Sequence, residues 1–138
     1  MPIESIKTIC VLGAGTMGAQ LSLLCANAGY STILSDIKPA AIEKAKTYVD
    51  NYYAGRVAKG RMTQEIADQN KARLIFDVGN ECAADADFVL EAIIENLDLK
   101  RKLFTELDQV CKPKCILASN SSMFVSSMLA SYTSRPDK

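Results

Sequence analysis

The sequence predicts an α/β fold built on a doubly wound, mostly parallel sheet with helices on both faces. Three observations support this prediction. Short apolar runs alternate with longer stretches of helical periodicity throughout the 138 residues. The first apolar run leads through a glycine-rich turn directly into a helix, as in a βαβ unit. The later apolar runs are nearly continuous, as expected of strands covered on both faces.

The composition is that of one ordinary globular domain. Hydrophobic residues make up 49% and charged residues 23% of the chain, and 16 basic side chains balance 16 acidic ones. A balanced charge favours neither nucleic acid nor a membrane surface as a partner. No apolar run reaches transmembrane length, and residues 1–4 lack the pattern of a signal peptide. We therefore expect a cytoplasmic protein.

The cysteines and the lack of histidine limit the chemistry. The chain has five cysteines and no histidine, and the cysteines fit no zinc-binding spacing. We expect reduced thiols and no metal site. Without histidine, a Ser-His-Asp hydrolase is excluded.

The first strand and helix flank a glycine motif. Residues 9–18 read Ile-Cys-Val-Leu-Gly-Ala-Gly-Thr-Met-Gly, which places G-x-G-x-x-G at the start of a helix. Gly13 permits a tight turn, Gly15 lets a pyrophosphate approach the backbone, and Gly18 lets the helix pack closely. The unpaired first amides and the dipole of the helix attract phosphate. The motif predicts a dinucleotide-binding Rossmann unit whose phosphate loop is Gly13, Ala14, Gly15, Thr16, Met17 and Gly18.

The next helix and strand complete this unit. A helix over 16–28 ends at Gly29 and is predicted to turn one apolar stripe inward, formed by Met17, Leu21, Leu24 and Ala28. The strand over 32–34 leads to Asp36, about twenty residues after the loop, where a carboxylate binds the adenosine ribose. A carboxylate repels a 2′-phosphate, so we expect NAD rather than NADP. Lys38 is close enough to soften that preference, but on a turn we expect its side chain to be solvated instead.

Two helices of different character follow. Pro39 opens a helix over 40–59 that ends at Gly60, and its predicted inward stripe is Ile42, Ala45, Val49, Tyr53 and Val57. A more polar helix over 63–72 precedes a short strand over 74–76. A turn over 78–80 and a small-residue turn or short helix over 82–86 come next.

The last third of the chain contains two further strands. A buried strand is predicted over 88–93, a helix over 97–111, a second buried strand over 115–118 and a last helix over 125–132. In the helix over 97–111 we expect the apolar side chains to face inward, namely Leu99, Leu103, Leu107 and Val110. The opposite face is predicted to hold Lys100, Lys102 and Glu106.

Parallel strands place their carboxyl ends on one rim, where a ligand crevice is expected. This topology brings the glycine loop, Asp36, Glu95 and the Ser119-Asn120-Ser121-Ser122 turn to that rim. Glu95 and Lys100 suit a cofactor ribose, but equally suit a helix cap facing solvent. The serine-rich turn suits a substrate hydroxyl near a nicotinamide, but is also an ordinary strand-to-helix turn.

Several stretches resemble the NAD-binding domain of the L-3-hydroxyacyl-CoA dehydrogenases, especially the 3-hydroxybutyryl-CoA dehydrogenases. They are Val-Leu-Gly-Ala-Gly-Thr-Met-Gly at 11–18, Ser35-Asp36, Lys59-Gly60, Phe-Val-Leu-Glu-Ala-Ile-Ile-Glu at 88–95, Lys100 with Phe104, and Ile-Leu-Ala-Ser-Asn-Ser-Ser at 116–122. The similarity spans essentially the whole chain. It implies oxidation of an L-3-hydroxyacyl-CoA to the 3-ketoacyl-CoA, as in fatty acid metabolism, with hydride transfer from C3 to NAD.

The resemblance also implies roles for matching residues. The loop over 13–18 would hold the pyrophosphate and Asp36 the adenosine ribose. The nicotinamide side would be lined by Ala92, Glu95 and Lys100. Asn120 would contact cofactor and substrate, Ser122 would hydrogen-bond the substrate 3-oxygen, and Lys59 would contact the CoA moiety.

The sequence departs from the family pattern in two side chains and at its end. Ser121 replaces a threonine and keeps the hydroxyl, whereas Tyr52 replaces a small residue that contacts CoA. The family continues past Arg-Pro into a stretch with the general-base histidine, and then into a helical domain that dimerises. We interpret residues 1–138 as the NAD-binding domain alone, without the end of that domain and without the helical domain. We expect this chain to bind NAD with negligible turnover.

Two alternatives remain. One is a non-catalytic dinucleotide-binding module. The other is a different NAD-dependent 3-hydroxyacid dehydrogenase, of the 3-hydroxyisobutyrate or 6-phosphogluconate type. That type commonly has arginine where this chain has Asp36, and it lacks the serine-rich turn.

Overall fold

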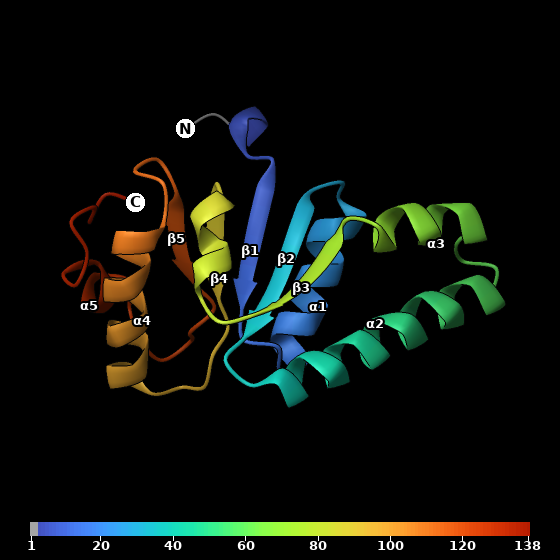
Figure 1. Ribbon diagram of the computed structural model, residues 1–138, viewed down its shortest axis with the longest axis horizontal. Helices are drawn as coiled ribbons and strands as arrows, with labels where there is room; N and C mark the ends of the chain where they lie inside the picture. The colour runs from blue at the N-terminus through green and yellow to red at the C-terminus, as the bar shows by residue number, and fades with distance from the viewer. Residues whose placement is uncertain (1–2) are drawn as a thin grey trace.

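A five-stranded sheet of order β3-β2-β1-β4-β5 runs through the centre of the molecule. The computed structural model describes residues 3–138, and all four strand pairs in it are parallel. Figure 1 shows the strands side by side with helices around them. The elements are η1 Ile3–Ser5, β1 Thr8–Leu12, α1 Thr16–Asn27, β2 Ser31–Asp36, α2 Pro39–Ala58, α3 Gln64–Lys71, β3 Leu74–Val78, η2 Glu81–Asp85, β4 Phe88–Glu91, α4 Leu97–Val110, β5 Ile116–Ser119 and α5 Ser127–Ala130. The predicted Rossmann-type fold is therefore confirmed.

The strand order reverses direction at β1, which lies between β2 and β4. The register aligns the carboxyl ends of four strands in one row. Leu12 pairs with Ser35 of β2 and with Glu91 of β4, and Glu91 pairs with Ser119 of β5. In an open α/β sheet the ligand crevice forms outside the carboxyl ends of the strands at such a reversal. We therefore expect the ligand site beside this row of residues.

The two faces of the sheet bury different sets of side chains. On one face Cys10 and Leu12 of β1 pack with residues of η2 and α4, including Ala83, Leu103 and Leu107. On the other face the alternate residues of β1, Ile9 and Val11, pack against α1 and α2. A strand turns successive side chains to opposite faces, so β1 is covered on both. A third cluster joins α1, α2, α3 and β3.

The inward face of α2 agrees with the sequence prediction, whereas that of α1 does not. In α2 the residues Ile42, Ala45, Val49 and Tyr53 are buried, and Val57 is half-buried. In α1, Met17 is 50% exposed and Leu24 is 65% exposed. The buried face of α1 is instead made of Gly18, Ala19, Ser22, Leu23 and Ala26. These small residues let α1 lie close to the sheet. Because α1 is apolar on more than one side, periodicity alone did not identify the buried stripe.

The prediction for α4 was also wrong at its first turn. Leu99 is 45% exposed, whereas Lys100 is only 1% exposed. The buried face runs through Lys100, Leu103, Phe104 and Leu107. Lys100 can be buried because Glu91 pairs with it, as described below.

The remaining boundaries differ by a few residues from those predicted. β3 extends to Val78 and β4 stops at Glu91, so residues 92–93 belong to a loop. α5 covers only Ser127–Ala130. All four residues of β5 are half-buried rather than fully buried, because β5 is an edge strand.

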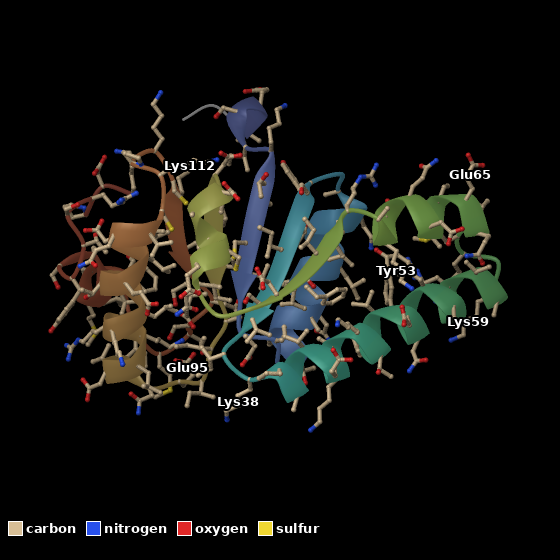
Figure 2. All side chains as sticks on the ribbon, in the orientation of Figure 1. Lys38, Tyr53, Lys59, Glu65, Glu95 and Lys112 are labelled. Carbon is tan, nitrogen blue, oxygen red and sulfur yellow. The ribbon has the colours of Figure 1, made fainter. Side chains whose placement is uncertain are left out.

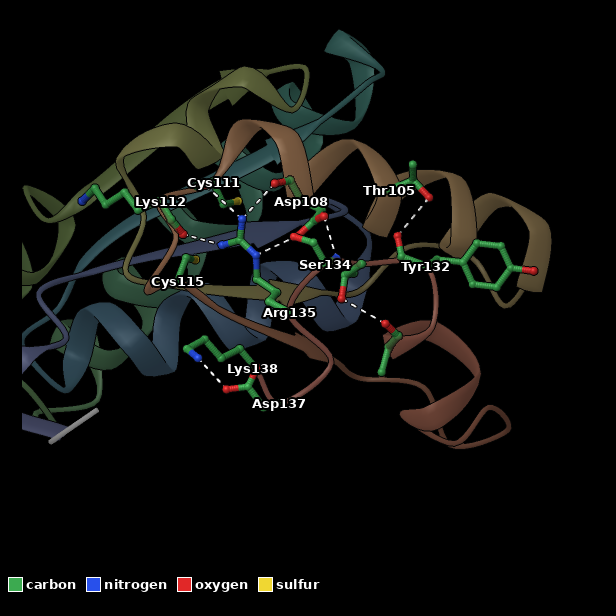
Figure 3. Close-up of polar contacts among 12 residues, drawn as sticks. Thr105, Asp108, Cys111, Lys112, Cys115, Tyr132, Ser134, Arg135, Asp137 and Lys138 are labelled. Carbon is green, nitrogen blue, oxygen red and sulfur yellow. Dashed lines mark hydrogen bonds and ion pairs between the residues drawn. The ribbon is translucent and has the colours of Figure 1, made fainter.

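The segment after α5 is tied to the end of α4 by Arg135 (Figure 3). Its guanidinium donates to Asp108 Oδ1 at 2.8 Å and to the Asp108 carbonyl at 2.8 Å, and it also bonds the Lys112 carbonyl. The Ser134 amide donates to Asp108 Oδ2 at 2.7 Å. A cation at the carboxyl end of a helix also interacts favourably with its dipole. These contacts hold the pKa of Asp108 below its usual value, with the Ser134 amide as the main cause.

Residues 3–138 contain neither a membrane-spanning helix nor a cluster of potential metal ligands. No helix in this range is both long enough and apolar enough to cross a bilayer. Within the same range, no three potential metal ligands lie together. All five cysteines are free thiols, and Cys10 and Cys82 lie with their sulfur atoms 3.9 Å apart.

Candidate functional site

The glycine loop has the geometry that its motif predicts. Gly13 has φ +104°, a left-handed conformation that favours glycine. A Cβ on Gly13 would lie 2.5 Å from the Ala92 carbonyl oxygen, and one on Gly18 would lie 1.7 Å from the Gly13 carbonyl oxygen. These two glycines therefore allow the loop, α1 and the residues after β4 to pack against one another.

Gly15 has a different environment. A Cβ built on it has no atom within 4 Å, so the space beside its backbone is open. Gly15 is the N-cap of α1 and has no side chain with which to cap the first amides of the helix. Thr16 and Met17 are exposed beside it, whereas Ala14 is buried. An open backbone at the electropositive end of a helix fits the pyrophosphate of a dinucleotide.

Asp36 lies directly against this loop. Its Oδ2 accepts a hydrogen bond from the Ala14 amide at 2.8 Å, and its Oδ1 accepts one from the Lys38 amide at 2.8 Å. The two bonds fix the half-buried carboxylate at the end of β2, next to the start of α1. A carboxylate in this position suits the hydroxyls of an adenosine ribose.

Glu91 was not predicted to have a role in the site, yet it is the polar centre of the other half of the rim. Its side chain is 0% exposed. Oε1 accepts hydrogen bonds from Lys100 Nζ at 2.6 Å and from the Ile93 amide at 2.7 Å, and Oε2 accepts one from Ser119 Oγ at 2.6 Å. We call Glu91, Lys100 and Ser119 the Glu91 cluster. A single glutamate within the apolar stretch over 88–93 was the signal that could have revealed it.

Glu95 and Ser121 extend the Glu91 cluster toward solvent. Glu95 Oε2 lies 3.7 Å from Lys100 Nζ and accepts a hydrogen bond from Ser121 Oγ at 2.9 Å. Ser121 Oγ also accepts from the amides of Met123 and Phe124. The hydroxyl therefore joins the turn after β5 to the loop after β4. The Asn120 amide donates to the Glu91 carbonyl at 2.8 Å, which fixes the same turn from the other side.

The two halves of the rim meet at Ala92. The Ala92 amide donates to the Leu12 carbonyl at 2.7 Å, immediately before the glycine loop. Its own carbonyl faces Gly13. The glycine loop, Asp36 and the Glu91 cluster thus form one continuous edge at the reversal of strand order.

The comparisons with known proteins agree with this geometry. The sequence model described as 3-hydroxyacyl-CoA dehydrogenase, NAD binding domain, matches residues 8–138. The chain belongs to this family. It is the NAD-binding domain, and NAD is its cofactor.

Individual relatives share this region over nearly the whole chain. The 3-hydroxyadipyl-CoA dehydrogenase of Escherichia coli is 32% identical over 97% of this chain and 28% of its own length. A peroxisomal fatty acid beta-oxidation multifunctional protein of Arabidopsis thaliana is 32% identical over 98% of this chain and 19% of its own. The crystal structure of (S)-3-hydroxybutyryl-CoA dehydrogenase from Ralstonia eutropha superposes with a TM-score of 0.92 at 33% identity, covering 96% of this chain and 47% of that one. The chain thus spans less than half the length of each of these relatives.

The residues predicted from the family pattern do not all lie at the rim. Lys59 is exposed and follows the last residue of α2, a helix of 20 residues that is about 30 Å long. Figure 2 shows Lys59 at the far end of α2, whereas Glu95 and Lys38 lie at the rim. Ser122 and Asn120 are exposed in the turn after β5.

Tyr52 is engaged within the domain. Its hydroxyl accepts a hydrogen bond from the Asn27 amide group at 3.3 Å, and the Arg56 guanidinium lies 5.6 Å from its ring centre. Its ring also packs edge-on against Tyr53.

Proposed function

We propose that this chain supplies the NAD-binding domain of an enzyme that oxidises an L-3-hydroxyacyl-CoA to the 3-ketoacyl-CoA, of the 3-hydroxybutyryl-CoA dehydrogenase type. One observation carries the proposal. The rim combines a glycine loop with open space at Gly15, the carboxylate of Asp36 and a turn with exposed Asn120 and Ser122, in a domain of this family. Two of the relatives above are named for different substrates, 3-hydroxyadipyl-CoA and (S)-3-hydroxybutyryl-CoA. Both named substrates are 3-hydroxyacyl-CoAs.

We assign the parts of the cofactor and of the substrate to particular residues of this chain. The loop over 13–18 binds the pyrophosphate and Asp36 binds the adenosine ribose. The nicotinamide side is formed by Ala92, Glu95, Lys100 and Asn120. Ser122 and Asn120 are the residues that we assign to the substrate 3-oxygen, because both are exposed at the end of β5. Lys59 is assigned to the CoA moiety because it matches a lysine of the family pattern that contacts CoA.

The chemistry requires a hydride acceptor and a proton acceptor. When bound, NAD accepts the hydride that leaves C3 of the substrate. Ser122 orients the 3-hydroxyl but does not take up its proton near neutral pH. Glu95 is occupied by Ser121 and Lys100, and the chain contains no histidine. General-base assistance contributes about 10²–10⁴-fold to such reactions, so residues 1–138 alone should bind NAD and turn over very slowly.

The absence of histidine from these 138 residues also favours one alternative, a non-catalytic dinucleotide-binding module. For the enzyme, we propose a cytoplasmic location, an acyl-CoA as the substrate partner, and dimerisation through a domain outside this chain. Neither nucleic acid nor a membrane is proposed as a partner.

The test is NADH oxidation with acetoacetyl-CoA, measured on residues 1–138 and on any longer product of the same gene. We expect NADH binding by both and turnover only by a longer product that carries a histidine base. Family-like turnover by residues 1–138 that disappears in Ser122→Ala would show that the base lies within this chain. Binding without turnover by every product of the gene would favour the non-catalytic module.

A further inference from the structure

We propose that Glu91 is a positioning residue that sets the charge on the nicotinamide side of the site and thereby favours NAD+ over NADH. Its buried carboxylate retains the Lys100 ammonium inside the domain and leaves Glu95 as the net negative charge at the rim. This proposal rests on the proposed function only in placing the nicotinamide beside Glu95 and Lys100.

The contacts of Glu91 connect three separate segments. Its Oε1 accepts hydrogen bonds from the Ile93 amide in the loop after β4 and from Lys100 in the first turn of α4. Through Oε2 it holds the end of β5, at Ser119. Its carbonyl accepts the amide of Asn120. The nicotinamide-side residues proposed above all lie within these three segments, so Glu91 fixes their relative positions without facing solvent itself.

Stability alone does not account for a charged pair at this place. Removing a carboxylate and an ammonium from water costs several kcal/mol per ion, and well-packed apolar residues of similar volume often stabilise a fold as well or better. Glu91 and Lys100 are 0% and 1% exposed. Their position at the carboxyl end of β4, beside the reversal of strand order, gives the pair a role in the site.

The charges near Lys100 do not cancel. Lys100 Nζ lies 2.6 Å from Glu91 Oε1 and 3.7 Å from Glu95 Oε2. Two carboxylates and one ammonium leave a net charge of minus one, and Glu95 is the member of the three that is open to solvent. The nicotinamide ring is positively charged in NAD+ and neutral in NADH. A net negative charge beside it therefore stabilises the oxidised cofactor more than the reduced one.

Glu91→Gln removes one negative charge and keeps the side-chain shape. Lys100 can then neutralise Glu95, and the net charge beside the nicotinamide falls to zero. We expect the ratio of Kd for NAD+ to Kd for NADH to rise about three- to tenfold, the order expected from removing one charge near a partly solvated site. Isothermal titration calorimetry with NAD+, NADH and ADP measures the effect. ADP lacks both the nicotinamide and its ribose and contacts only the other half of the rim, so its Kd should change less than about twofold.

Two further variants make the test specific. Glu65→Gln removes the same charge from exposed α3, at the far side of the molecule from Glu95 (Figure 2), and should leave all three affinities unchanged. Glu91→Gln combined with Lys100→Met removes both buried charges and leaves Glu95 as a net charge of minus one. This double variant should keep the wild-type ratio while binding both dinucleotides more weakly. It also has no unpaired buried charge, so it provides a folded protein if Glu91→Gln alone does not fold.

The outcomes separate the two proposals. An unchanged ratio in folded Glu91→Gln, or a double variant that binds both dinucleotides as wild type does, would overturn the role of Glu91. Equal weakening of the binding of ADP and of both dinucleotides by Glu91→Gln would also overturn it, because the residue would then act only on the fold. The acetoacetyl-CoA assay decides the proposed substrate independently, since the ratio of cofactor affinities is measured without any substrate.

Discussion

The glycine loop and the Glu91 cluster lie on the same rim but are built from different parts of the chain. The loop presents backbone, with an open position at Gly15 and close contacts at Gly13 and Gly18. The Glu91 cluster presents side chains from β4, α4 and β5 that pair in a buried environment. The glycine loop depends on the absence of side chains, whereas the Glu91 cluster depends on how its side chains pair with one another. Substitutions should therefore damage the two halves by different routes.

The largest effect is expected from breaking the Glu91 cluster. Lys100→Met leaves the Glu91 carboxylate buried without its cationic partner. Removing one member of a buried ion pair costs about 3–5 kcal/mol of unfolding free energy. Urea unfolding followed by circular dichroism measures this loss. Lys46→Met is the matched control, because Lys46 and Glu43 form an exposed pair that should contribute less than about 1 kcal/mol. Equal losses in the two variants would contradict the assignment.

The glycine loop should separate stability from binding at neighbouring positions. Gly18→Ala places a Cβ 1.7 Å from the Gly13 carbonyl oxygen, and we expect a loss of about 3 kcal/mol in unfolding free energy. Gly15→Val has no such contact and should leave the fold intact. Its side chain would occupy the space that we assign to the pyrophosphate, so NADH binding should be lost. Parental NADH affinity in folded Gly15→Val would show that the phosphate binds elsewhere.

The Arg135 contacts should make stability fall in acid. The folded pKa of Asp108 is lowered by the Ser134 amide and by Arg135, so the unfolded chain takes up this proton more readily than the folded one. The stabilisation is present above the unfolded pKa of about 4 and is lost as the pH falls below it. Arg135→Ala should lower the unfolding free energy at neutral pH by about 1–2 kcal/mol and flatten its dependence on pH below about 5. An unchanged slope in this range would contradict the contribution of Arg135 to the lowered pKa of Asp108.

The smallest effect concerns cofactor choice. Asp36 faces the position that we assign to the adenosine ribose, where a 2′-phosphate would be repelled. Asp36→Ala should narrow the preference for NADH over NADPH by about 1 kcal/mol, or about fivefold. Fluorescence titration with both cofactors measures the preference. Wild-type affinities that are equal for the two cofactors would overturn the assignment of Asp36.

The contrast between the glycine loop and the Glu91 cluster explains which parts of the site could be predicted from the sequence. Gly13 and Asp36 were found because a turn and a strand end lie at fixed spacings along one short βαβ unit. Lys100 was placed on the wrong face because its burial depends on Glu91, which lies in a different element. Periodicity treats a lysine as polar wherever it lies, and it contains no information about a partner across the fold. The buried face of α1 was misassigned for a related reason. Which side of this helix is buried depends on its packing against the sheet, and the pattern within the helix does not contain that information.

The register of β1 has a consequence for the order in which the site assembles during folding. Ile9 pairs with Thr32 on one side and with Phe88 on the other. Closing the longer loop costs more chain entropy, and distant pairings of this kind slow folding. We therefore expect β1, α1 and β2 to form before β4 docks, so that the glycine loop and Asp36 become native while Glu91 is still solvated. In pulse-labelled hydrogen exchange, the amides of β1 that bond to β2 should gain protection before those of Ala92 and Asn120.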